Sequence, residues 1–277
     1  MSKTKKIIIL ILAILICIGL TIYNAIFINT KDITVRKETI TSNKIDSNID
    51  GLIIAYFSDL HYGTFLDDED LDNIENKINN FSPDIVIFGG DLFDEALDGE
   101  KTAKLENFLR NINAKYGKYA VLGDKDNNYY DQVNSIYNEC DFRLLNNTNE
   151  KIYLNGSYIN LVGVDSSVNG NPNVSSAYDG INSTHYTVAI THCPDEANSL
   201  TSSLTDYILA GHSLGGQVYI PLINLFYRPS GATSYYHGKD DVDGVTLDIT
   251  NGLGTIENDI RLNADAEIVI YKLKKAN

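Results

Sequence analysis

The sequence predicts an α/β fold in which two β-sheets are flanked by helices, preceded by one N-terminal transmembrane helix. Three observations predict this class: an uncharged apolar run at the N-terminus, an early half in which strand and helix patterns alternate, and a later half of mostly strand patterns. Alternating strands and helices are typical of a largely parallel sheet, and the strand-rich half supplies strands for a second one. The roughly 245 residues after the apolar run suit one large domain.

The first thirty residues form a separate unit. Lys3, Lys5 and Lys6 precede an uncharged stretch at 7–28, and a helix needs about 20 apolar residues to span a bilayer. We expect the lysines to stay cytoplasmic, which makes the protein a single-pass protein of the cell membrane with an extracellular C-terminal domain. A cleaved signal peptide is the alternative, since a charged start and an apolar core fit both. No small-x-small cleavage site follows the run, which favours an uncleaved signal-anchor.

Charge and cysteine content exclude two classes of protein. The formal net charge is −15, and three of the 22 basic residues but none of the 37 acidic ones precede the apolar run, so the rest of the chain carries −18. Such a surface repels nucleic acid, which we therefore do not expect as a partner. Cys140 and Cys193 are the only later cysteines. They are too few for a disulfide scaffold and are expected to be buried free thiols, with one chance bridge as the alternative.

The early half of the domain alternates strands with helices. Residues 33–40 alternate polar and apolar, as a half-exposed edge strand does, whereas 52–57 is a continuous apolar run typical of a strand covered on both faces. Residues 66–81 predict a helix, because Leu71, Ile74 and Ile78 recur at spacings of three and four. The other early elements are expected as strands at 84–88 and 119–122 and helices at 102–112 and 129–137.

From residue 142 onward the pattern changes to strands. These strands are expected at 142–145, 151–154, 158–164, 187–190, 207–209, 244–249 and 267–273. The chain therefore divides into cytoplasmic lysines and an anchor at 1–30, a linker or edge strand at 31–50, and one domain at 51–277. An aromatic-rich segment at 225–236 is expected to line a substrate mouth or to contact the bilayer, with ordinary loop packing as the alternative.

Histidines and acids fall where apolar runs end. Three of the five histidines do so, and two further runs end in acids: Asp59-Leu60-His61, Thr191-His192-Cys193, Gly211-His212-Ser213, Gly89-Gly90-Asp91 and Gly123-Asp124-Lys125-Asp126. Groups delivered to the ends of neighbouring buried strands meet at one sheet edge, and carboxylate and imidazole are ligands of divalent metals. Each motif alone is commonly a tight turn, but together they predict a metal site. His185 and His237 are interpreted as structural or exposed.

This ordered set of motifs resembles the calcineurin-like metallophosphoesterases. Within them the chain is similar to the membrane-associated, YkuE- and YaeI-like bacterial branch, a likeness carried by Gly215-Gly216-Gln217 and by Gly252-Leu253-Gly254 with Arg261. The resemblance covers roughly residues 52–273 and implies a four-layered α/β/β/α sandwich of two mixed sheets. It also implies one or two divalent metal ions, Mn, Fe or Zn, which activate a water for attack on phosphorus.

Carried over residue by residue, the resemblance implies six metal ligands. Asp59 and His61 would hold the first metal, Asp91 would bridge both, and Asp124, His192 and His212 would complete the second.

The chain departs from the family pattern at three positions. Asp124 stands where the family has asparagine, and it keeps an oxygen ligand. Leu214 replaces the last histidine of the Gly-His-x-His pattern and leaves the first metal one ligand short. Lys125 stands in place of the catalytic histidine. With an ordinary pKa of about 10.4 a lysine is a poor proton donor, so Lys125 is expected as a catalytic residue that stabilises phosphoryl charge, or as a cation that substitutes for a metal.

These features predict a membrane-anchored, metal-dependent phosphoester hydrolase, acting on phosphodiesters and on lipid-linked or cell-envelope phosphates. The alternative is a degenerate phosphoesterase that binds a phosphorylated ligand or a partner without turnover. A serine hydrolase is a third interpretation, because Gly211, Ser213 and Gly215 match a nucleophile elbow. However, the residues after it alternate toward Pro221 as an extended segment, and no acid lies between Ser213 and His237.

Overall fold

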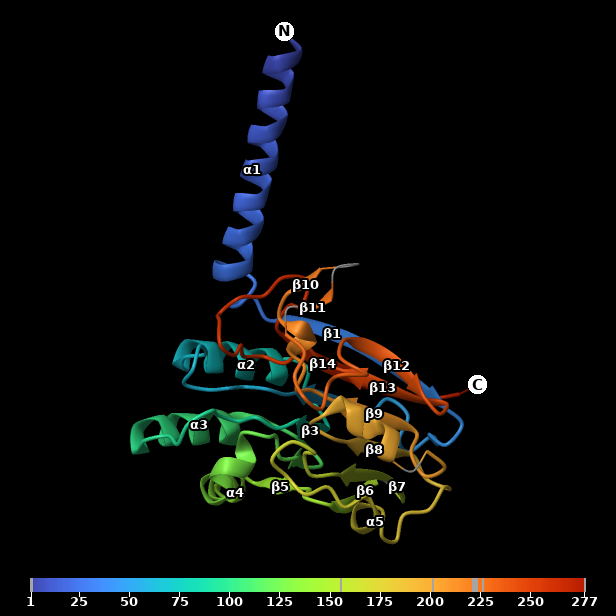
Figure 1. Ribbon diagram of the computed structural model, residues 1–277. Helices are drawn as coiled ribbons and strands as arrows, with labels where there is room; N and C mark the ends of the chain where they lie inside the picture. The colour runs from blue at the N-terminus through green and yellow to red at the C-terminus, as the bar shows by residue number, and fades with distance from the viewer. Residues whose placement is uncertain (1, 155, 201, 221–223, 226, 277) are drawn as a thin grey trace.

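The computed structural model describes residues 2–154, 156–200, 202–220, 224–225 and 227–276, so Pro221 and Phe226 lie outside the described residues (Figure 1). Helix α1 (Lys3–Phe27) projects alone from the domain (Figure 1). It is long and apolar enough to cross a membrane, and its most apolar stretch is not buried against the rest of the protein. The expected N-terminal helix is therefore present, as an apolar helix that could span a membrane.

The first of two six-stranded sheets contains the early strands and the chain's last strand. Its order is β1 (Thr34–Ser42), β14 (Glu267–Lys275), β2 (Ile53–Phe57), β3 (Ile85–Phe88), β4 (Lys118–Ala120) and β5 (Phe142–Leu144). Strands β2 to β5 run parallel, whereas β14 is antiparallel to β2 and parallel to β1. The sheet is therefore mixed, and β1 lies at its edge as its alternating pattern predicts.

The second sheet is also mixed. Its order is β12 (Gly238–Val242), β13 (Val245–Ile249), β9 (Tyr207–Ala210), β8 (Thr187–Ile190), β7 (Ser157–Gly163) and β6 (Thr148–Leu154). The four central strands are parallel and the two edge strands are antiparallel to their neighbours.

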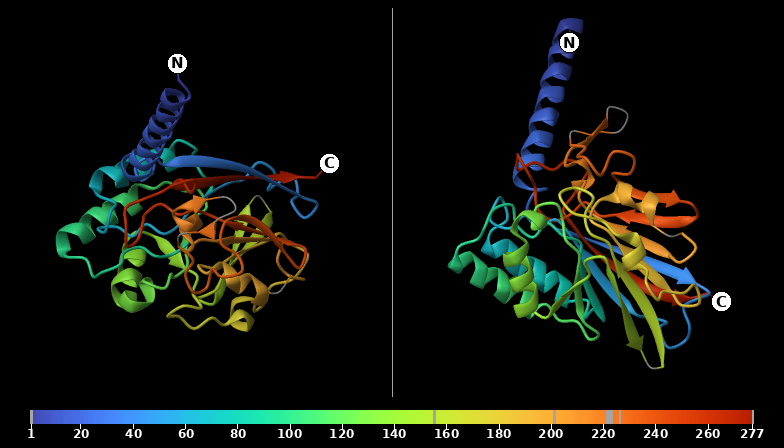
Figure 2. Two further views of the ribbon diagram at one scale, coloured as in Figure 1. Left: turned by 45° about the horizontal axis from the view of Figure 1, so that its top comes forward. Right: turned by 60° about the horizontal axis from the view of Figure 1, so that its bottom comes forward.

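The two sheets pack face to face, and helices cover their outer faces. Alternate residues of β2 show this arrangement: Ala55 and Phe57 join the core beneath the helices, whereas Ile54 and Tyr56 join the core between the sheets. The first sheet is covered by α2 (Asp68–Asn79), α3 (Gly99–Asn111) and α4 (Tyr130–Glu139), and the second by α5 (Val174–Ala177) and the 3-10 helix η2 (Pro194–Ser199). The predicted four-layered sandwich is confirmed, with a thin layer over the second sheet (Figure 2).

The structure adds elements that the sequence patterns do not predict. Strand β12 has the polar sequence Gly-Lys-Asp-Asp-Val, and it forms because its backbone pairs with β13. Short elements also occur between the main strands: the 3-10 helices η1 (Asp126–Tyr129) and η3 (Leu214–Gly216), and the paired strands β10 (Tyr219–Ile220) and β11 (Asn224–Leu225). Cys140 and Cys193 are buried and free, as expected.

Candidate metal centre

The loops that follow β2, β3, β4, β8 and β9 meet at one edge of the sandwich. There they bring together all six residues predicted to bind metal, as two overlapping groups: Asp91, Asp124, His192 and His212 in the first, and Asp59, His61 and Asp91 in the second. In each group one potential ligand atom per residue lies within 4.8 Å of the others. Asp91 belongs to both groups, which is the arrangement that a bridging carboxylate needs.

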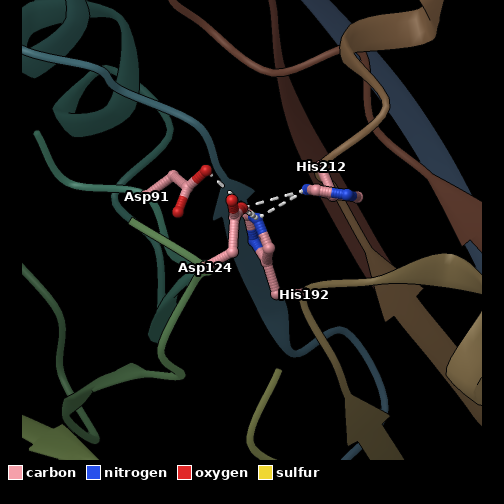
Figure 3. Close-up of side chains that lie close together, drawn as sticks. All are labelled: Asp91, Asp124, His192 and His212. Carbon is pink, nitrogen blue, oxygen red and sulfur yellow. Dashed lines mark hydrogen bonds and ion pairs between the residues drawn. The ribbon is translucent and has the colours of Figure 1, made fainter. Parts of the chain in front are cut away.

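Figure 3 shows the four-residue group, in which the ion-pair distances are shorter than in the other group. His192 Nε2 lies 3.3 Å from Asp91 Oδ2 and 3.4 Å from Asp124 Oδ1, and His212 Nδ1 lies 3.3 Å from the same Asp124 oxygen. In the other group, His61 Nε2 lies 3.8 Å from Asp91 Oδ2 and 3.9 Å from Asp59 Oδ1. The side chains of both groups are buried.

Each of the three histidines is held by one ring nitrogen and directs the other into the group. His192 Nδ1 lies 2.8 Å from the Gly89 carbonyl oxygen, His212 Nε2 lies 2.7 Å from the Ser230 carbonyl oxygen, and His61 Nδ1 lies 2.7 Å from Asp94 Oδ1. Because these oxygens accept hydrogen bonds, the nitrogens that face them carry the protons. When a ring is neutral, its inward nitrogen presents a lone pair, as metal-binding histidines do.

This donor set fits a divalent cation. His192 Nε2 and His212 Nδ1 are only 3.2 Å apart, so two neutral rings would point lone pairs at each other. Asp124 Oδ1, which lies beside both nitrogens, is buried and accepts no hydrogen bond from the residues that the structure describes. A buried carboxylate oxygen without a donor is costly, and a cation among these three atoms removes both the repulsion and the unsatisfied oxygen.

Negative charge dominates the electrostatics of the site. Burial lowers the pKa of His61, but the hydrogen bond to Asp94 and the charge of Asp91 outweigh it and raise this pKa to about 9. Burial likewise lowers the pKa of His192, and Asp91 and Asp124 raise it well above its ordinary value. The carboxylates therefore favour the protonated forms of His61 and His192, and a metal must displace these protons on binding.

The backbone of the site is held in uncommon conformations. Asp59, His61, Asp91 and His212 all adopt left-handed φ angles, of 55°, 46°, 59° and 66°. Such angles cost free energy in residues other than glycine and gather at functional sites. A glycine of the motifs has a steric role, because a Cβ on Gly123 would lie 2.1 Å from Asp91 Oδ1.

Two further acids, which the sequence reasoning did not assign, position the site. Asp126 is fully buried, and its carboxylate accepts hydrogen bonds from the N–H groups of Asp91, Leu92 and Gly123 at 2.8–2.9 Å. Asp94 orients His61 and accepts a second hydrogen bond from Thr64 Oγ1 at 2.7 Å. Asp126 belongs to the motif Gly123-Asp124-Lys125-Asp126, so its place beside a predicted ligand could have identified it as a residue of the site.

The other two departures from the family pattern, Lys125 and Leu214, also lie at the site. The Lys125 N–H donates to Asp91 Oδ1 at 2.8 Å, and its ammonium lies 4.0 Å from Asp124 Oδ2. Leu214 is fully buried. Its side chain and that of Asp59 both lie against Gly252: a Cβ added to this glycine would be 2.8 Å from Asp59 Cβ and 3.0 Å from Leu214 Cδ2. An apolar side chain therefore lies close to Asp59.

The nucleophile-elbow interpretation has no support in the local structure. Ser213 is followed by the three residues of η3 and then by β10, whereas an elbow serine opens an α-helix. Its hydroxyl is buried and accepts a hydrogen bond from the Gly215 N–H at 3.3 Å. Ser213 thus caps a turn.

Glu196 predicts a pH-dependent contribution to stability. Burial raises its pKa from 4.5 to about 7, although a hydrogen bond from the Thr191 hydroxyl and the charge of His192 oppose this. A raised pKa favours the folded state below the unfolded value of 4.5, and this stabilisation is lost as pH rises through 7. In the wild type we expect the ionisation of Glu196 to lower the unfolding free energy by up to about 3 kcal/mol between about pH 5 and 8. Glu196→Gln cannot ionise and should not show this decrease.

Urea unfolding at both pH values measures this effect. The difference between wild type and Glu196→Gln cancels the other titrating groups, and equal pH slopes in the two proteins would contradict the assignment to Glu196.

The chain is similar in sequence to known metallophosphoesterases. The sequence model of a family described as "Calcineurin-like phosphoesterase" matches residues 52–251. The chain is 27% identical to the uncharacterized metallophosphoesterase YkuE of Bacillus subtilis, over 88% of this chain and 87% of that protein. It is 26% identical to the UDP-2,3-diacylglucosamine pyrophosphatase LpxG of Chlamydia muridarum, over 63% of this chain and 67% of that protein. The solved structure of TT1561 from Thermus thermophilus aligns with a TM-score of 0.49 at 10% identity, covering 73% of this chain and 90% of that one.

Proposed function

Because the chain belongs to the calcineurin-like phosphoesterase family, we propose that it is a membrane-anchored, metal-dependent phosphodiesterase acting on lipid-linked or cell-envelope phosphates. The observation that carries this proposal is the convergence of Asp91, Asp124, His192 and His212, joined through Asp91 to the second group. Divalent cations bound there would supply Lewis acidity toward phosphoryl oxygens and lower the pKa of an attacking water.

The residues have distinct roles in this proposal. Asp59 and His61 would hold one cation, Asp124, His192 and His212 would hold the other, and Asp91 would contribute to both. The acceptors on the outer ring nitrogens keep each imidazole in the tautomer that binds metal.

In this proposal Lys125 is the residue that contacts the phosphoryl group. Its ammonium lies at the rim of the four-residue group, and its side chain is 37% exposed. A cation at this position stabilises negative charge on phosphate oxygens without donating a proton to the leaving group. We therefore expect phosphodiesters with good leaving groups to be the better substrates.

Metal stoichiometry tests whether Lys125 and Leu214 limit the binding of a second metal ion. Lys125→Ala is expected to increase uptake of a second Mn²⁺, because the ammonium competes with a cation for the charge of Asp124 and its neighbours. Leu214→His is expected to act in the same direction by adding an imidazole beside Asp59. Metal content after equilibrium dialysis measures both. An unchanged stoichiometry in Lys125→Ala would show that Lys125 does not replace a cation.

The membrane assignment is supported by the junction between α1 and the domain. Ala25 and Thr30 are buried, with 2% and 4% of their surfaces exposed, so the end of the apolar helix is packed as part of the domain. Cleavage by a signal peptidase after the apolar run would cut through this packed junction, which favours an uncleaved anchor. The lysines before α1 favour an extracellular domain. The similarity to a pyrophosphatase named for a diacylated sugar nucleotide supports a lipid-linked phosphate as substrate.

A second candidate function is binding without turnover. It is favoured by Leu214 and Lys125, which stand where the family has a ligand and a catalytic histidine. In that case the same cation site would hold a phosphorylated ligand or partner.

Turnover by the full-length protein in detergent separates the two functions. The protein is stripped of metal, titrated with Mn²⁺, and assayed on the activated diester bis-p-nitrophenyl phosphate. Hydrolysis that rises with bound Mn²⁺ and saturates is the expected result. Binding of Mn²⁺ without hydrolysis would contradict the hydrolase and support the binding module.

A further inference from the structure

The membrane helix is docked on the domain through direct hydrogen bonds. The Arg261 N–H donates to the Ala25 carbonyl oxygen at 2.9 Å, and the Asn29 side-chain amide donates to the Arg261 carbonyl oxygen at 3.0 Å. These bonds join the last turn of α1 to a segment more than 200 residues away in the sequence. The orientation of the domain relative to α1 is therefore determined by packing.

The segment that receives α1 also supports the metal site. Arg261 is fully buried, and its guanidinium donates to the carbonyl oxygens of Asn251 at 3.0 Å and Gly254 at 2.5 Å. The Gly254 N–H in turn donates to the Asp59 carbonyl oxygen at 2.7 Å. A short chain of hydrogen bonds thus connects the membrane helix with a proposed metal ligand.

The same segment holds β10 beside the base of α1. The Gln217 side-chain oxygen accepts from the Ile256 N–H at 2.7 Å, and the Tyr219 N–H donates to the Leu262 carbonyl oxygen at 2.8 Å. Strands β10 and β11 lie on the side of the domain from which α1 projects (Figures 1 and 2). The segment around Arg261 therefore contacts the base of α1, strand β10 and, through Gly254, the loop of Asp59, which places the metal site next to this face.

This face carries partly exposed apolar side chains around the end of a membrane helix. We call them the apolar collar, and they are Val218, Tyr219, Ile220, Ile256, Ile260 and Leu262. Ile220 is the most exposed, at 38% of its surface. In the sequence, the stretch from 218 to 227 contains no charged residue.

We propose that the apolar collar is a second membrane contact, which inserts into the lipid interface and holds the rim of the metal site at the level of the headgroups. The occupant is a lipid bilayer because α1 emerges at the collar, so a bilayer crossed by α1 begins at this face. The contact is apolar in character, since Glu257, Asp259 and the net charge of −18 beyond α1 oppose attraction to anionic headgroups.

The proposal deepens the function proposed above and rests on it for the substrate. With the rim at headgroup level, the site reaches the phosphodiester of a lipid that stays in the bilayer. Substrates free in solution gain nothing from the collar.

The absence of tryptophan from the sequence makes the contact directly measurable. Full-length Ile220→Trp is reconstituted into phosphatidylcholine vesicles with or without bromine on the upper acyl chains. The matched control is Tyr153→Trp, a 68% exposed position on β6, away from α1. We expect brominated lipid to quench most of the emission of Ile220→Trp and none of that of Tyr153→Trp. Equal emission of Ile220→Trp in both kinds of vesicle would overturn the proposal. The collar would then not be in contact with lipid, even if it binds another partner.

A flexible insertion tests whether docking matters to the reaction. A Gly/Ser linker of about 16 residues after Phe27 spans roughly 20–24 Å and frees the domain from the bilayer surface. In this variant we expect loss of quenching at Ile220→Trp and a several-fold lower rate on a bilayer-resident phosphodiester, with an unchanged rate on bis-p-nitrophenyl phosphate. Unchanged rates on both substrates would contradict the role of the collar. Absence of turnover on either substrate would refute the hydrolase, while the quenching result would still decide the membrane contact.

Discussion

Replacement of Asp91 by asparagine is expected to lower Mn²⁺-dependent phosphodiester hydrolysis by on the order of 10²–10³-fold or more, the scale observed when one preorganised stabiliser of developing charge is removed. Asp91 is the residue shared by both ligand groups. Its Oδ1 accepts the Lys125 N–H, and its Oδ2 lies 3.3 Å from His192 Nε2. An asparagine has the same size but carries no charge, and it presents an N–H₂ group where a ligand oxygen is required.

The measurement is kcat/KM at saturating Mn²⁺, together with the metal content of each protein. Asp240→Asn is the matched control, because it removes one charge from an exposed position on β12. A rate in Asp91→Asn equal to that of the control would exclude a bridged metal site as the catalytic centre.

Replacement of Asp126 by alanine is expected to destabilise the fold by on the order of 3 kcal/mol or more. The substitution leaves three N–H groups, those of Asp91, Leu92 and Gly123, without their acceptor in a buried position. Each unsatisfied buried group costs about 1–3 kcal/mol. Because all three groups belong to the loops that present Asp91 and Asp124, we also expect weaker Mn²⁺ binding.

Urea unfolding and Mn²⁺ titration measure the two effects in the same samples. Asp126→Asn retains one acceptor oxygen and should be intermediate in stability, whereas Asp240→Ala should match wild type. Wild-type stability in Asp126→Ala would show that water replaces the carboxylate and that Asp126 does not position the metal loops.

The local sequence is sufficient for most of the architecture. A strand buried on both faces must be apolar at every position, so 52–57 and 84–88 predicted β2 and β3 within one or two residues. Helix α2 begins at Asp68 instead of 66 because Asp67 accepts hydrogen bonds from the N–H groups of Glu69 and Asp70. Strand β12 and the short elements were missed, since their residues follow no apolar period and their pairing depends on neighbours.

The candidate ligands were also accessible from the sequence, because each stands directly after an apolar run and parallel strands share one carboxyl edge. What only the tertiary structure decided is how those ligands are held. The Gly89 carbonyl fixes the His192 tautomer across 103 residues, Asp94 orients His61, and Arg261 joins α1 to the loop that supports Asp59. These partners lie far apart in the chain and belong to irregular loops. Periodicity records whether a side chain is buried, whereas the identity of its partner depends on the packing of whole sheets and loops against one another.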